Sequence, residues 1–506
     1  MNSKNTNYSN NIVIDKTKCT FCGICIDRCI LDNLRLQLSP CRNACPLGQN
    51  CQGYIQEIAR GRFDNASSLI RETSPLPHVL GRICSRPCET ACNRNQVDDQ
   101  AVSIRNLKRY AVNAVKRPDP CLPDRERVES VGIVGSGPAG LMAAWELRKL
   151  GYRTRLYEKS SVPGGNMTTA IPEFRLPLAV VMEEIAWLEK WGIEIKTGVR
   201  INDDMTVDQL MDEHAAVLLA TGANRPIDLD IGSGDAPNIF SAVSFLESVK
   251  QGDKPDIGSS VVIIGGGNSA VDAAQTARRM GVESVKLVCL ERSEAEMPAF
   301  PWAIAEALND GITIDWGWGP DSFSSKDGRA PGLICRRCLS VWDGELFSPR
   351  LDPETEKTFQ ADSFIIGIGT CADSDFLNDA CSLSSTDLQF ESDPLTLETI
   401  VPGIFIAGDA ATGPTSVVDA MASGRRAAVS IDRYIRGEDL RYGRAYAGPY
   451  LTEFPLDLNS AKPGPRQAAP KLPPKLTIDQ RLSFNETNSV FDDAAAMEES
   501  GRCMSC

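Results

Sequence analysis

Four zones follow one another along the chain, and each has its own pattern of apolar and polar positions. Residues 53–72 and 103–115 carry apolar side chains at helical spacing, which predicts amphipathic helices near the N-terminus. From about residue 129 to 437, amphipathic stretches alternate with short apolar runs that read VGIVG, VVIIG, FIIGIG and IFIAG. Apolar runs separated by helices are typical of parallel sheets. The pattern therefore predicts an α/β core that follows a smaller helical region.

Proline-rich sequence bounds the α/β core on both sides. The stretch KRPDPCLPDRERVES precedes the core, and GPYLTEFPLDLNSAKPGPRQAAPKLPPKL follows it. Because proline favours extended backbone over helix, we expect residues 438–506 to form an extended arm. The arm ends in a short predicted helix, FDDAAAMEESGRC, which leads into the pair Cys503 and Cys506.

Composition and charge narrow the classes of function. The chain has 506 residues, 42% of them hydrophobic, which is typical of a globular protein with several domains. A formal net charge of -14 argues against binding to nucleic acid or to an anionic membrane surface. No apolar run approaches the roughly 20 residues of a membrane span, and the N-terminal sequence lacks a signal-peptide pattern. We therefore expect a cytoplasmic protein.

The distribution of the 18 cysteines favours metal or cluster binding over disulfides. Ten cysteines lie in the first 92 residues, two lie in the last four, and six are scattered between. Secreted disulfide scaffolds are small and evenly cross-linked, and this chain is neither. Since His78 and His214 are the only histidines, imidazole-based zinc sites and a Ser-His-Asp triad are disfavoured.

Two segments carry the pattern of a dinucleotide-binding fold. In the first, a strand leads into Gly135, Gly137 and Gly140, and the next strand ends at Glu158, 21 residues after Gly137. The glycines permit a tight turn and bring a helix N-terminus close to a pyrophosphate, while the carboxylate can accept both ribose hydroxyls. The alternative is a glycine-rich turn without a ligand, which would not require all of these parts in register.

The second segment repeats this arrangement further along the chain. Gly265 and Gly267 are followed by Ala270 in the third position, and the next strand ends at Glu291, 24 residues after Gly267. Two such folds in one chain predict a flavin on one and a nicotinamide on the other, with a hydride passing between them.

Residues 130–437 resemble the flavoproteins with two dinucleotide domains that include thioredoxin reductase. They resemble more closely the small subunit of glutamate synthase and the N-terminal half of dihydropyrimidine dehydrogenase. The resemblance rests on VPGGNM, IPEFRLP, LLATGA, EMPAF and IFIAGDAATGPTSVVDAMASGRRAA. It implies an α/β fold with an NAD(P)-binding domain (257–361) inserted in an FAD-binding domain (129–256 and 362–437), after a mainly α-helical iron–sulfur domain (39–120).

The resemblance also implies which residues contact the two dinucleotides. In the family the first motif binds FAD, the late Gly-Asp pair returns to the flavin, and the second motif binds NAD(P)H. The residues expected to bind the cofactors are Gly135, Gly137, Pro138, Ala139, Gly140, Glu158, Gly164, Gly165, Thr221, Gly222, Gly265, Gly267, Asn268, Ser269, Ala270, Glu291, Arg292, Gly408, Asp409 and Ser416.

The end of the second motif bears on the choice of nicotinamide. Relatives that use NADP tend to place an arginine pair there to hold the 2′-phosphate, whereas this chain reads CLERSE. Glu291 would repel that phosphate and accept ribose hydroxyl hydrogens, although Arg292 could still reach a phosphate. We favour NAD(H), and NADP(H) stays open.

Thioredoxin reductase relatives also carry a redox disulfide in a Cys-x-x-Cys beside the flavin. Inside the α/β core that spacing belongs to Cys335 and Cys338, in sequence that predicts strand and turn. This context favours a buried pair over a redox disulfide. Electrons would then leave the flavin through the cysteine-rich zone.

The run KCTFCGICIDRCI has the cysteine spacing of bacterial ferredoxins. Its first three cysteines can hold one [4Fe–4S] cluster from a tight loop, and the fourth usually serves another cluster. A structural zinc knuckle is the alternative, and Ile30 replaces the usual proline. We assign residues 1–38 to a ferredoxin-like motif.

The remaining cysteines resemble those of the helical iron–sulfur domain in the same family, which binds two [4Fe–4S] clusters. The resemblance gives Cys45, Cys84 and Cys88 to one cluster, and Cys41 and Cys92 to the other. The cysteine pair that relatives supply upstream is missing, but MEESGRCMSC resembles the helix that carries it. We expect the terminal pair to complete the second cluster, in the same chain or in another copy. The alternatives are a disordered tail and the beginning of a further ferredoxin motif.

Twelve cysteines are then available, enough for three clusters. Cys29 and Cys51 would supply the fourth ligands of the two other clusters, in an order that the sequence leaves open. In some relatives a residue other than cysteine fills one such place, but the corresponding residue here resembles Lys108, a poor ligand. The twelve candidates are Cys19, Cys22, Cys25, Cys29, Cys41, Cys45, Cys51, Cys84, Cys88, Cys92, Cys503 and Cys506.

These features predict an electron-transfer flavoprotein subunit that passes electrons between NAD(P)H and a partner redox enzyme through FAD and [4Fe–4S] clusters. The partner could be a glutamate synthase large subunit, a metal-dependent aldehyde or formate oxidoreductase, or a hydrogenase. The alternatives are a free-standing NAD(P)H:ferredoxin-type or bifurcating oxidoreductase and the glutamate synthase small subunit itself. A redox sensor would not need two intact dinucleotide motifs. Because such a protein positions and tunes its cofactors, we name no acid–base catalytic residue.

Overall fold

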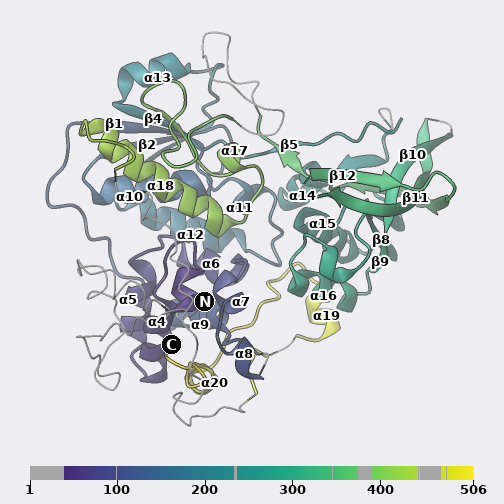
Figure 1. Cartoon of the computed structure of the whole chain (residues 1–506), viewed down its shortest axis with the longest axis horizontal. Helices are drawn as coiled ribbons and strands as arrows, with labels where there is room; N and C mark the ends of the chain where they lie inside the picture. Colours follow the sequence, from purple (N-terminus) through teal and green to yellow (C-terminus); the bar gives the residue numbers. More distant parts are fainter. Residues whose placement is uncertain are drawn as a thin grey trace, which may run out of the picture. The chain divides into compact units, whose positions relative to one another are not determined.

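The computed structural model describes residues 39–98, 100–232, 236–326, 328–344, 346–373, 390–442, 444, 469–474 and 476–506. The chain divides into two compact units (Figure 1). The helical unit comprises Met1–Asp119, Arg441–Pro474 and Val490–Cys506, and the α/β unit comprises Pro120–Leu440 and Lys475–Ser489. The predicted ferredoxin-like motif with Cys19, Cys22, Cys25 and Cys29 lies outside the described residues.

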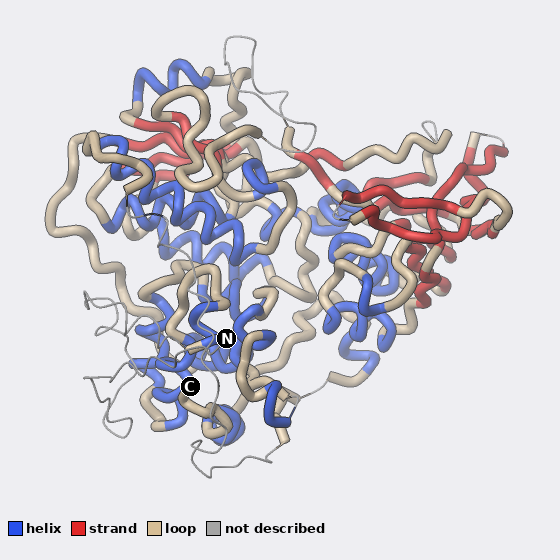
Figure 2. The backbone as a smooth tube through the Cα atoms, in the orientation of Figure 1, coloured by secondary structure: helices blue, strands red, loops and turns tan. Residues whose placement is uncertain are grey.

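Short helices build the N-terminal part of the helical unit (Figure 2). The apolar pattern over 53–72 forms two helices, because Gly61 takes a left-handed φ of 70° and ends the first of them. Tyr54, Ile58 and Leu107 are fully buried in the core of this unit. The helices are α3 (Pro40–Asn43), α4 (Cys51–Ala59), α5 (Phe63–Arg71), α6 (Pro77–Ile83), α7 (Pro87–Thr90), α8 (Asn95–Asp98) and α9 (Ile104–Asn113).

The C-terminal helix α20 (Asp493–Ser500) packs against α4 and α9. The sequence predicted this helix, and Asp492 begins it by accepting a hydrogen bond from the backbone N–H of Ala495 at 2.7 Å. Phe491 and Ala496 complete the apolar core of the helical unit. The end of the chain is therefore part of this core.

A buried ion pair fixes the residues that follow α20. The Arg502 Nη1 donates to Glu499 Oε1 at 2.8 Å, and the two side chains are 1% and 0% exposed. Arg502 also donates to the carbonyls of Gln100 and Ala101, and Glu499 accepts from the backbone N–H groups of Ser103 and Lys471. Both charges are thus satisfied inside the protein, as a buried pair requires.

In the α/β unit, the first sheet has five parallel strands in the order β16-β4-β1-β2-β3. Helices α10 (Pro138–Lys149) and α18 (Val417–Ile435) pack side by side against it (Figure 1). Gly424 permits this contact, because a Cβ there would lie 2.1 Å from the carbonyl oxygen of Ala139. The strands are β1 (Ser130–Val134), β2 (Arg153–Glu158), β3 (Glu194–Thr197), β4 (Ala216–Leu219) and β16 (Ile404–Ile406).

The second sheet has the strand order β6-β14-β7-β8-β9, again all parallel, and differs from the first in that its edge strand β6 comes first in sequence. Helices α14 (Ala242–Lys250), α15 (Asn268–Arg279) and α16 (Pro301–Asn309) share one apolar core with it. The sheet lies between β4 and β16 of the first sheet in sequence, so the predicted insertion of one Rossmann-like domain in the other is confirmed. Its strands are β6 (Ile239–Ser241), β7 (Ser260–Ile264), β8 (Ser284–Cys289), β9 (Thr313–Trp316) and β14 (Ser363–Ile366).

The second sheet extends beyond the expected bounds of 257–361 at both ends. The edge strand β6 precedes residue 257, and β14 follows residue 361 and pairs between β6 and β7. Hydrogen bonding places the FIIGIG run, which the sequence analysis expects in the FAD domain, in the second sheet. The strands of this sheet thus span residues 239–366.

An antiparallel sheet covers the other face of the second sheet. Phe323, Leu333 and Phe359 of this sheet pack on Val262 and Val288 of the parallel one. The antiparallel strands are β10 (Trp318–Lys326), β11 (Arg329–Asp343), β12 (Leu346–Leu351) and β13 (Lys357–Gln360). None of the helices in the described ranges combines the length and apolarity that crossing a membrane requires.

The substitution Arg502→Met should release the C-terminal segment from the helical unit. It leaves the Glu499 carboxylate buried without its cation, and breaking a buried pair in this way costs about 3–5 kcal/mol. We expect the backbone amides of α20 to exchange with deuterium roughly 100-fold faster or more, as followed by mass spectrometry.

Glu498→Gln is the matched control for this experiment. Glu498 also forms an ion pair on the same helix, with Lys471 at 3.1 Å, but the two side chains are 59% and 45% exposed. Its loss should cost less than about 1 kcal/mol. Equal exchange in the two variants would show that the buried pair does not hold the segment.

Candidate functional site

In both parallel sheets the predicted glycines follow a strand at which the strand order reverses, where open α/β sheets bind their ligands. Gly135 follows β1 with a φ of 100°, and a Cβ there would lie 2.4 Å from the carbonyl oxygen of Ala220. A Cβ on Gly140 would lie 2.1 Å from the Gly135 carbonyl oxygen. Both positions therefore require glycine. A Cβ on Gly137 would meet no atom within 4 Å, which leaves open space at the N-terminus of α10.

Other predicted flavin-binding residues gather around this turn. A Cβ on Gly165 would lie 2.9 Å from the Gly137 Cα, and one on Gly408 would lie 2.9 Å from the Ala139 Cβ. Thr221 and Gly222 follow β4, and the Thr221 hydroxyl is buried without a hydrogen-bond partner among the described residues. A buried hydroxyl without a partner is costly, so it fits a position that a bound ligand would satisfy.

Local hydrogen bonds order the segment 408–416, which lies near the end of the first domain. Asp409 begins the short helix α17 (Asp409–Thr412) and accepts from the Thr415 backbone N–H and hydroxyl at 3.0 and 2.7 Å. Burial raises the pKa of the Asp409 carboxyl above its usual value. Ser416 begins α18 by accepting from the backbone N–H of Asp419. This arrangement fixes where the Gly408-Asp409 turn lies beside Ala139.

Glu158 is held in place by a serine that sequence reasoning missed. Ser136 donates to Glu158 Oε2 from both its backbone N–H and its hydroxyl, at 3.0 and 2.6 Å. The same hydroxyl accepts from the backbone N–H of Gly164 at 3.0 Å. Ser136 therefore links the glycine turn, the acidic residue and the Gly164-Gly165 loop. The motif treats its position as variable, so the sequence contains no signal for this role.

The second motif repeats the close backbone approach of the first. Gly265 follows β7 with a φ of 131°, and a Cβ there would lie 2.2 Å from the carbonyl oxygen of Gly367. Ala270 is fully buried, and its Cβ would lie 3.1 Å from a Cβ on Gly367. Gly367 is a second residue that the sequence reasoning missed. Gly367 directly follows β14 as Ala220 directly follows β4, so comparing FIIGIG with LLATGA could have identified it.

Glu291 and Arg292 differ in their surroundings. Glu291 Oε2 is buried without a hydrogen-bond partner among the described residues, and a Cβ on Gly266 would lie 2.4 Å from it. The Arg292 side chain is 57% exposed, and its guanidinium pairs with Glu296 at 3.1 Å. The carboxylate next to the glycine turn thus has acceptor capacity for a hydroxyl, while the nearby cation is already paired.

Asn268 and Ser269 complete the second glycine turn. The Asn268 side chain accepts a hydrogen bond from the Phe300 backbone N–H at 3.0 Å, whereas Ser269 is exposed at the start of α15. The turns of both motifs therefore leave a helix N-terminus open to a pyrophosphate.

In the helical unit, Cys41, Cys92, Cys503 and Cys506 line a single cavity. Two hydrogen bonds hold the terminal pair there, from Gln52 Nε2 to the Cys506 carbonyl at 2.8 Å and from Arg94 Nη1 to the Arg502 carbonyl at 2.9 Å. The structure thus brings together, within one copy of the chain, the four cysteines that the sequence analysis assigned to one cluster.

A second group consists of Cys45, Cys84 and Cys88, which are 9%, 4% and 4% exposed. Burial raises the pKa of the Cys45 thiol to about 11 and also raises that of Cys84. Lys108 on α9 is the cationic neighbour of all three, and it is itself 2% exposed. Burial alone would lower the pKa of Lys108, but the negative charge of nearby thiolates raises it overall.

Cys51 lies between these two groups. Its thiol makes hydrogen bonds with Cys41 and Cys88, one from each group, and it is 1% exposed. The hydrogen bond from Cys51 lowers the pKa of Cys41 to about 7, whereas burial raises the pKa of Cys503 to about 12. Eight described cysteines therefore form one continuous set of thiols, of which Cys45, Cys51, Cys84 and Cys88 are buried and Cys506 is exposed.

The donor chemistry of this set fits iron–sulfur clusters. Within the described residues, no three His, Cys, Asp or Glu side chains converge closely enough to hold one metal ion. A cubane spreads its four iron atoms over four separate thiolates, so its ligands stand around a larger group. Cys41, Cys92, Cys503 and Cys506 would hold one cluster, and Cys45, Cys84 and Cys88 would supply three ligands to another.

The described cysteines of the α/β unit have other roles. Cys335 and Cys338 are both buried on β11, and both are free thiols. Cys335 lies in the apolar core between the parallel and antiparallel sheets. This is the surrounding expected of a buried pair.

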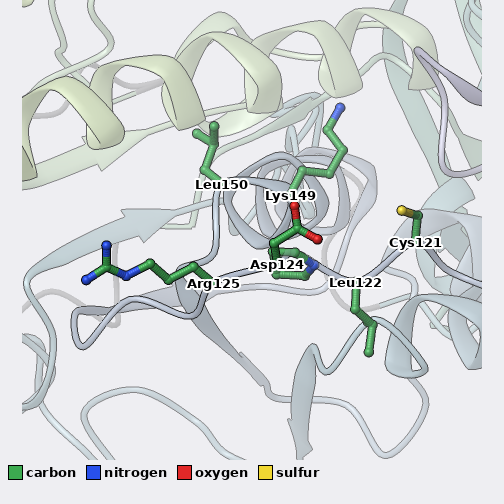
Figure 3. A pocket seen from close by; sticks show the side chains of 7 residues that line it. Cys121, Leu122, Asp124, Arg125, Lys149 and Leu150 are labelled. Carbon is green, nitrogen blue, oxygen red and sulfur yellow. The ribbon is translucent and has the colours of Figure 1, made fainter.

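A surface hollow of about 380 Å³ lies apart from the predicted sites, around Cys121, Asp124 and Lys149 (Figure 3). Figure 3 shows the charged ends of Arg125 and Lys149 directed away from each other. The Lys149 ammonium instead pairs with Glu146 at 2.6 Å and lies 3.8 Å from the Trp145 ring centre. Its polar groups do not converge, so this hollow indicates no ligand site.

Two family models match the chain. The model described as pyridine nucleotide-disulphide oxidoreductase matches residues 129–424, and the one described as dihydropyrimidine dehydrogenase domain II, 4Fe-4S cluster, matches residues 5–119. Among solved structures, FprA of Mycobacterium tuberculosis in complex with NADPH has a TM-score of 0.53 at 16% identity, covering 62% of this chain and 85% of FprA. The likeness to FprA shows the fold.

Two curated relatives match over most of their length. The NADP(+)-dependent formate dehydrogenase subunit beta of Moorella thermoacetica is 32% identical, over 92% of this chain and 70% of the relative. The glutamate synthase [NADPH] small chain of Azospirillum brasilense is 31% identical, over 79% of this chain and 86% of the relative. The chain therefore belongs to the pyridine nucleotide-disulphide oxidoreductases, among the NAD(P)H-dependent FAD and iron–sulfur enzymes related to the glutamate synthase small chain.

Proposed function

We propose that this protein is the electron-transfer subunit of a larger redox enzyme, and that it connects NAD(H) to that enzyme through FAD and three [4Fe–4S] clusters. When bound, FAD exchanges a hydride with the nicotinamide, and each cluster carries single electrons. The chain's own contribution is to hold these groups in place. The glycine turns at Gly135 and Gly265 would hold the two pyrophosphates through the backbone N–H groups at the helix N-termini that follow them.

The observation that carries this proposal is the grouping of Cys41, Cys92, Cys503 and Cys506 around one cavity. Four thiols are the complete ligand set of a cubane, and two of them come from the far end of the chain. With Cys45, Cys84 and Cys88 packed nearby, the helical unit offers a continuous set of thiols for two clusters. The third cluster would belong to Cys19, Cys22 and Cys25, with Cys29 and Cys51 as the remaining fourth ligands.

The contact of Cys51 with Cys88 supports Cys51 as the fourth ligand of the cluster on Cys45, Cys84 and Cys88. Cys29 would then serve the ferredoxin-like motif. Cys51 also contacts Cys41, but the group around Cys41 already has four thiols.

Glu291 supports NAD(H) as the nicotinamide. Its unpaired, buried oxygen beside Gly266 is placed to accept a ribose hydroxyl and would repel a 2′-phosphate. Arg292, the cation that could hold that phosphate, is paired with Glu296. Both relatives named above carry NADP or NADPH in their names, so we propose that this chain differs from them in its choice of nicotinamide.

The relatives' names also bear on the partner. One is a formate dehydrogenase subunit and the other a glutamate synthase chain, so we infer a hetero-oligomeric complex whose larger subunit carries the substrate chemistry. The second candidate function is a free-standing oxidoreductase that exchanges electrons with ferredoxin. The ferredoxin-like motif over residues 1–38 favours it, because such a motif can exchange electrons with a soluble carrier.

Replacing the terminal pair, Cys503→Ser/Cys506→Ser, should remove one cluster and leave the others. Iron and acid-labile sulfide per FAD should fall from about twelve to about eight in protein purified without oxygen, since each cubane contains four irons. Cys121→Ser is the control, because Cys121 is exposed and lies in the α/β unit. An unchanged count in the double variant would mean that Cys41 and Cys92 have other partners.

The substitution Glu291→Gln should lower the efficiency with which the protein uses NADH, and not that with which it uses NADPH. Losing hydrogen bonds to a charged acceptor costs about 1.5–3 kcal/mol, so kcat/KM for NADH with an artificial acceptor should fall about 10–100-fold. The value of kcat/KM for NADPH should stay the same or rise, because the repulsion between the Glu291 carboxylate and the 2′-phosphate is removed. Glu283→Gln, an exposed acid of the same domain, is the matched control. A wild-type preference for NADPH above tenfold would contradict the assignment to NAD(H).

Purification of the protein from its native source separates the two candidate functions. A complex with a stoichiometric larger subunit is the expected result. Isolation without such a subunit, together with full turnover of NADH with oxidised ferredoxin or of NAD⁺ with reduced ferredoxin, would instead support the free-standing oxidoreductase.

A further inference from the structure

We propose that Lys108 raises the reduction potential of the cluster bound by Cys45, Cys84 and Cys88. This inference rests on the proposed cluster at those three cysteines. It concerns what the protein does to that cluster, beyond whether the cluster is present.

Lys108 lies in the middle of α9, and its side chain is directed into the helical unit with 2% of its surface exposed. Its electrostatic neighbours are the four thiols of Cys84, Cys45, Cys88 and Cys51. These are the three cysteines of the second group and the one that we favour as its fourth ligand. A single ammonium therefore faces the whole proposed ligand set.

Burying an ammonium is costly unless opposite charge compensates it. Neutral thiols cannot supply that charge, whereas four thiolates on an iron–sulfur cluster carry net negative charge. Each one-electron reduction adds one further unit of negative charge at the same place. The Lys108 ammonium thus stabilises the reduced cluster more than the oxidised one, and the potential rises.

Arg105, a second buried cation of α9, differs from Lys108 in what it faces. Arg105 donates to the Cys84 carbonyl at 3.5 Å and faces Cys84 among the three cysteines of the second group, whereas Lys108 faces all three. Cys92 and Cys503 interact with Cys41 and Cys506, Cys41 interacts with Cys51, and Lys108 is not among the main electrostatic neighbours of Cys41, Cys92 or Cys503. The effect of Lys108 should therefore fall on one cluster. The Lys108 charge would therefore make this cluster easier to reduce than the same cluster without it.

The test is a potentiometric titration of the whole flavoprotein, followed by electron paramagnetic resonance of the reduced clusters. In Lys108→Met, one cluster component should become at least tenfold harder to reduce, which corresponds to a shift of about 59 mV to lower potential for one electron. The other components should keep their midpoints. Lys108→Arg preserves the charge and should keep the wild-type midpoint of that component.

Lys116→Met is the matched control, since it removes the same charge from an exposed lysine of the helical unit. Iron and sulfide are counted in every variant, so that a missing cluster is distinguished from a shifted one. If Lys108→Met loses iron, the midpoint potential is measured on Lys108→Gln instead, which removes the same charge but keeps a polar side chain. An unshifted midpoint with full iron content would overturn the proposal. Loss of iron from Met, Gln and Arg variants alike would also overturn it, by assigning Lys108 a structural role.

Discussion

The helical unit depends on one buried ion pair, between Glu499 and Arg502. Every donor and acceptor of this pair that the structure gives is matched by backbone from residues 100–103 or 471, so it joins parts of the chain that are far apart in sequence. A buried pair of this kind adds little to stability compared with an apolar contact, but it tolerates few alternative positions. It therefore sets where Cys503 and Cys506 lie. The apolar contacts of Phe491 and Ala496 supply the hydrophobic stabilisation that the ion pair does not provide.

The α/β unit depends on a different constraint, the approach of backbone to backbone without side chains between. Gly135 against Ala220 and Gly265 against Gly367 are the same contact in two parallel sheets whose central strands, β4-β1-β2-β3 and β14-β7-β8-β9, follow the same order. Because only glycine fits, the carboxyl ends of the central strands come close enough to share one ligand. The two domains differ in what lies next to this contact. Glu158 is tied down by Ser136, while Glu291 keeps an oxygen without a partner.

Features that depend on periodicity and spacing could be predicted from the sequence. The apolar runs became β1, β7, β14 and β16, and the terminal helix became α20. The grouping of Cys41 and Cys92 with Cys503 and Cys506 was reached through the family resemblance, not from spacing. What the sequence did not give depends on contacts between distant segments. The assignment of β14 to the inserted sheet, the link through Ser136 and the position of Cys51 between two thiol groups all arise from tertiary packing.

The contact between Gln52 and Cys506 spans 454 residues of sequence, which has a consequence for biosynthesis. A ribosome adds about 5–20 residues per second, so roughly 20–90 s separate the synthesis of these two residues. During that interval Cys41 and Cys92 are already made and have no counterpart from the C-terminal segment. The four ligands of the cluster proposed at this cavity would be complete only after Cys506 has been synthesised. A chain interrupted before α20 would leave Cys41 and Cys92 without the thiols of the C-terminal segment, and thiols without a partner are open to oxidation.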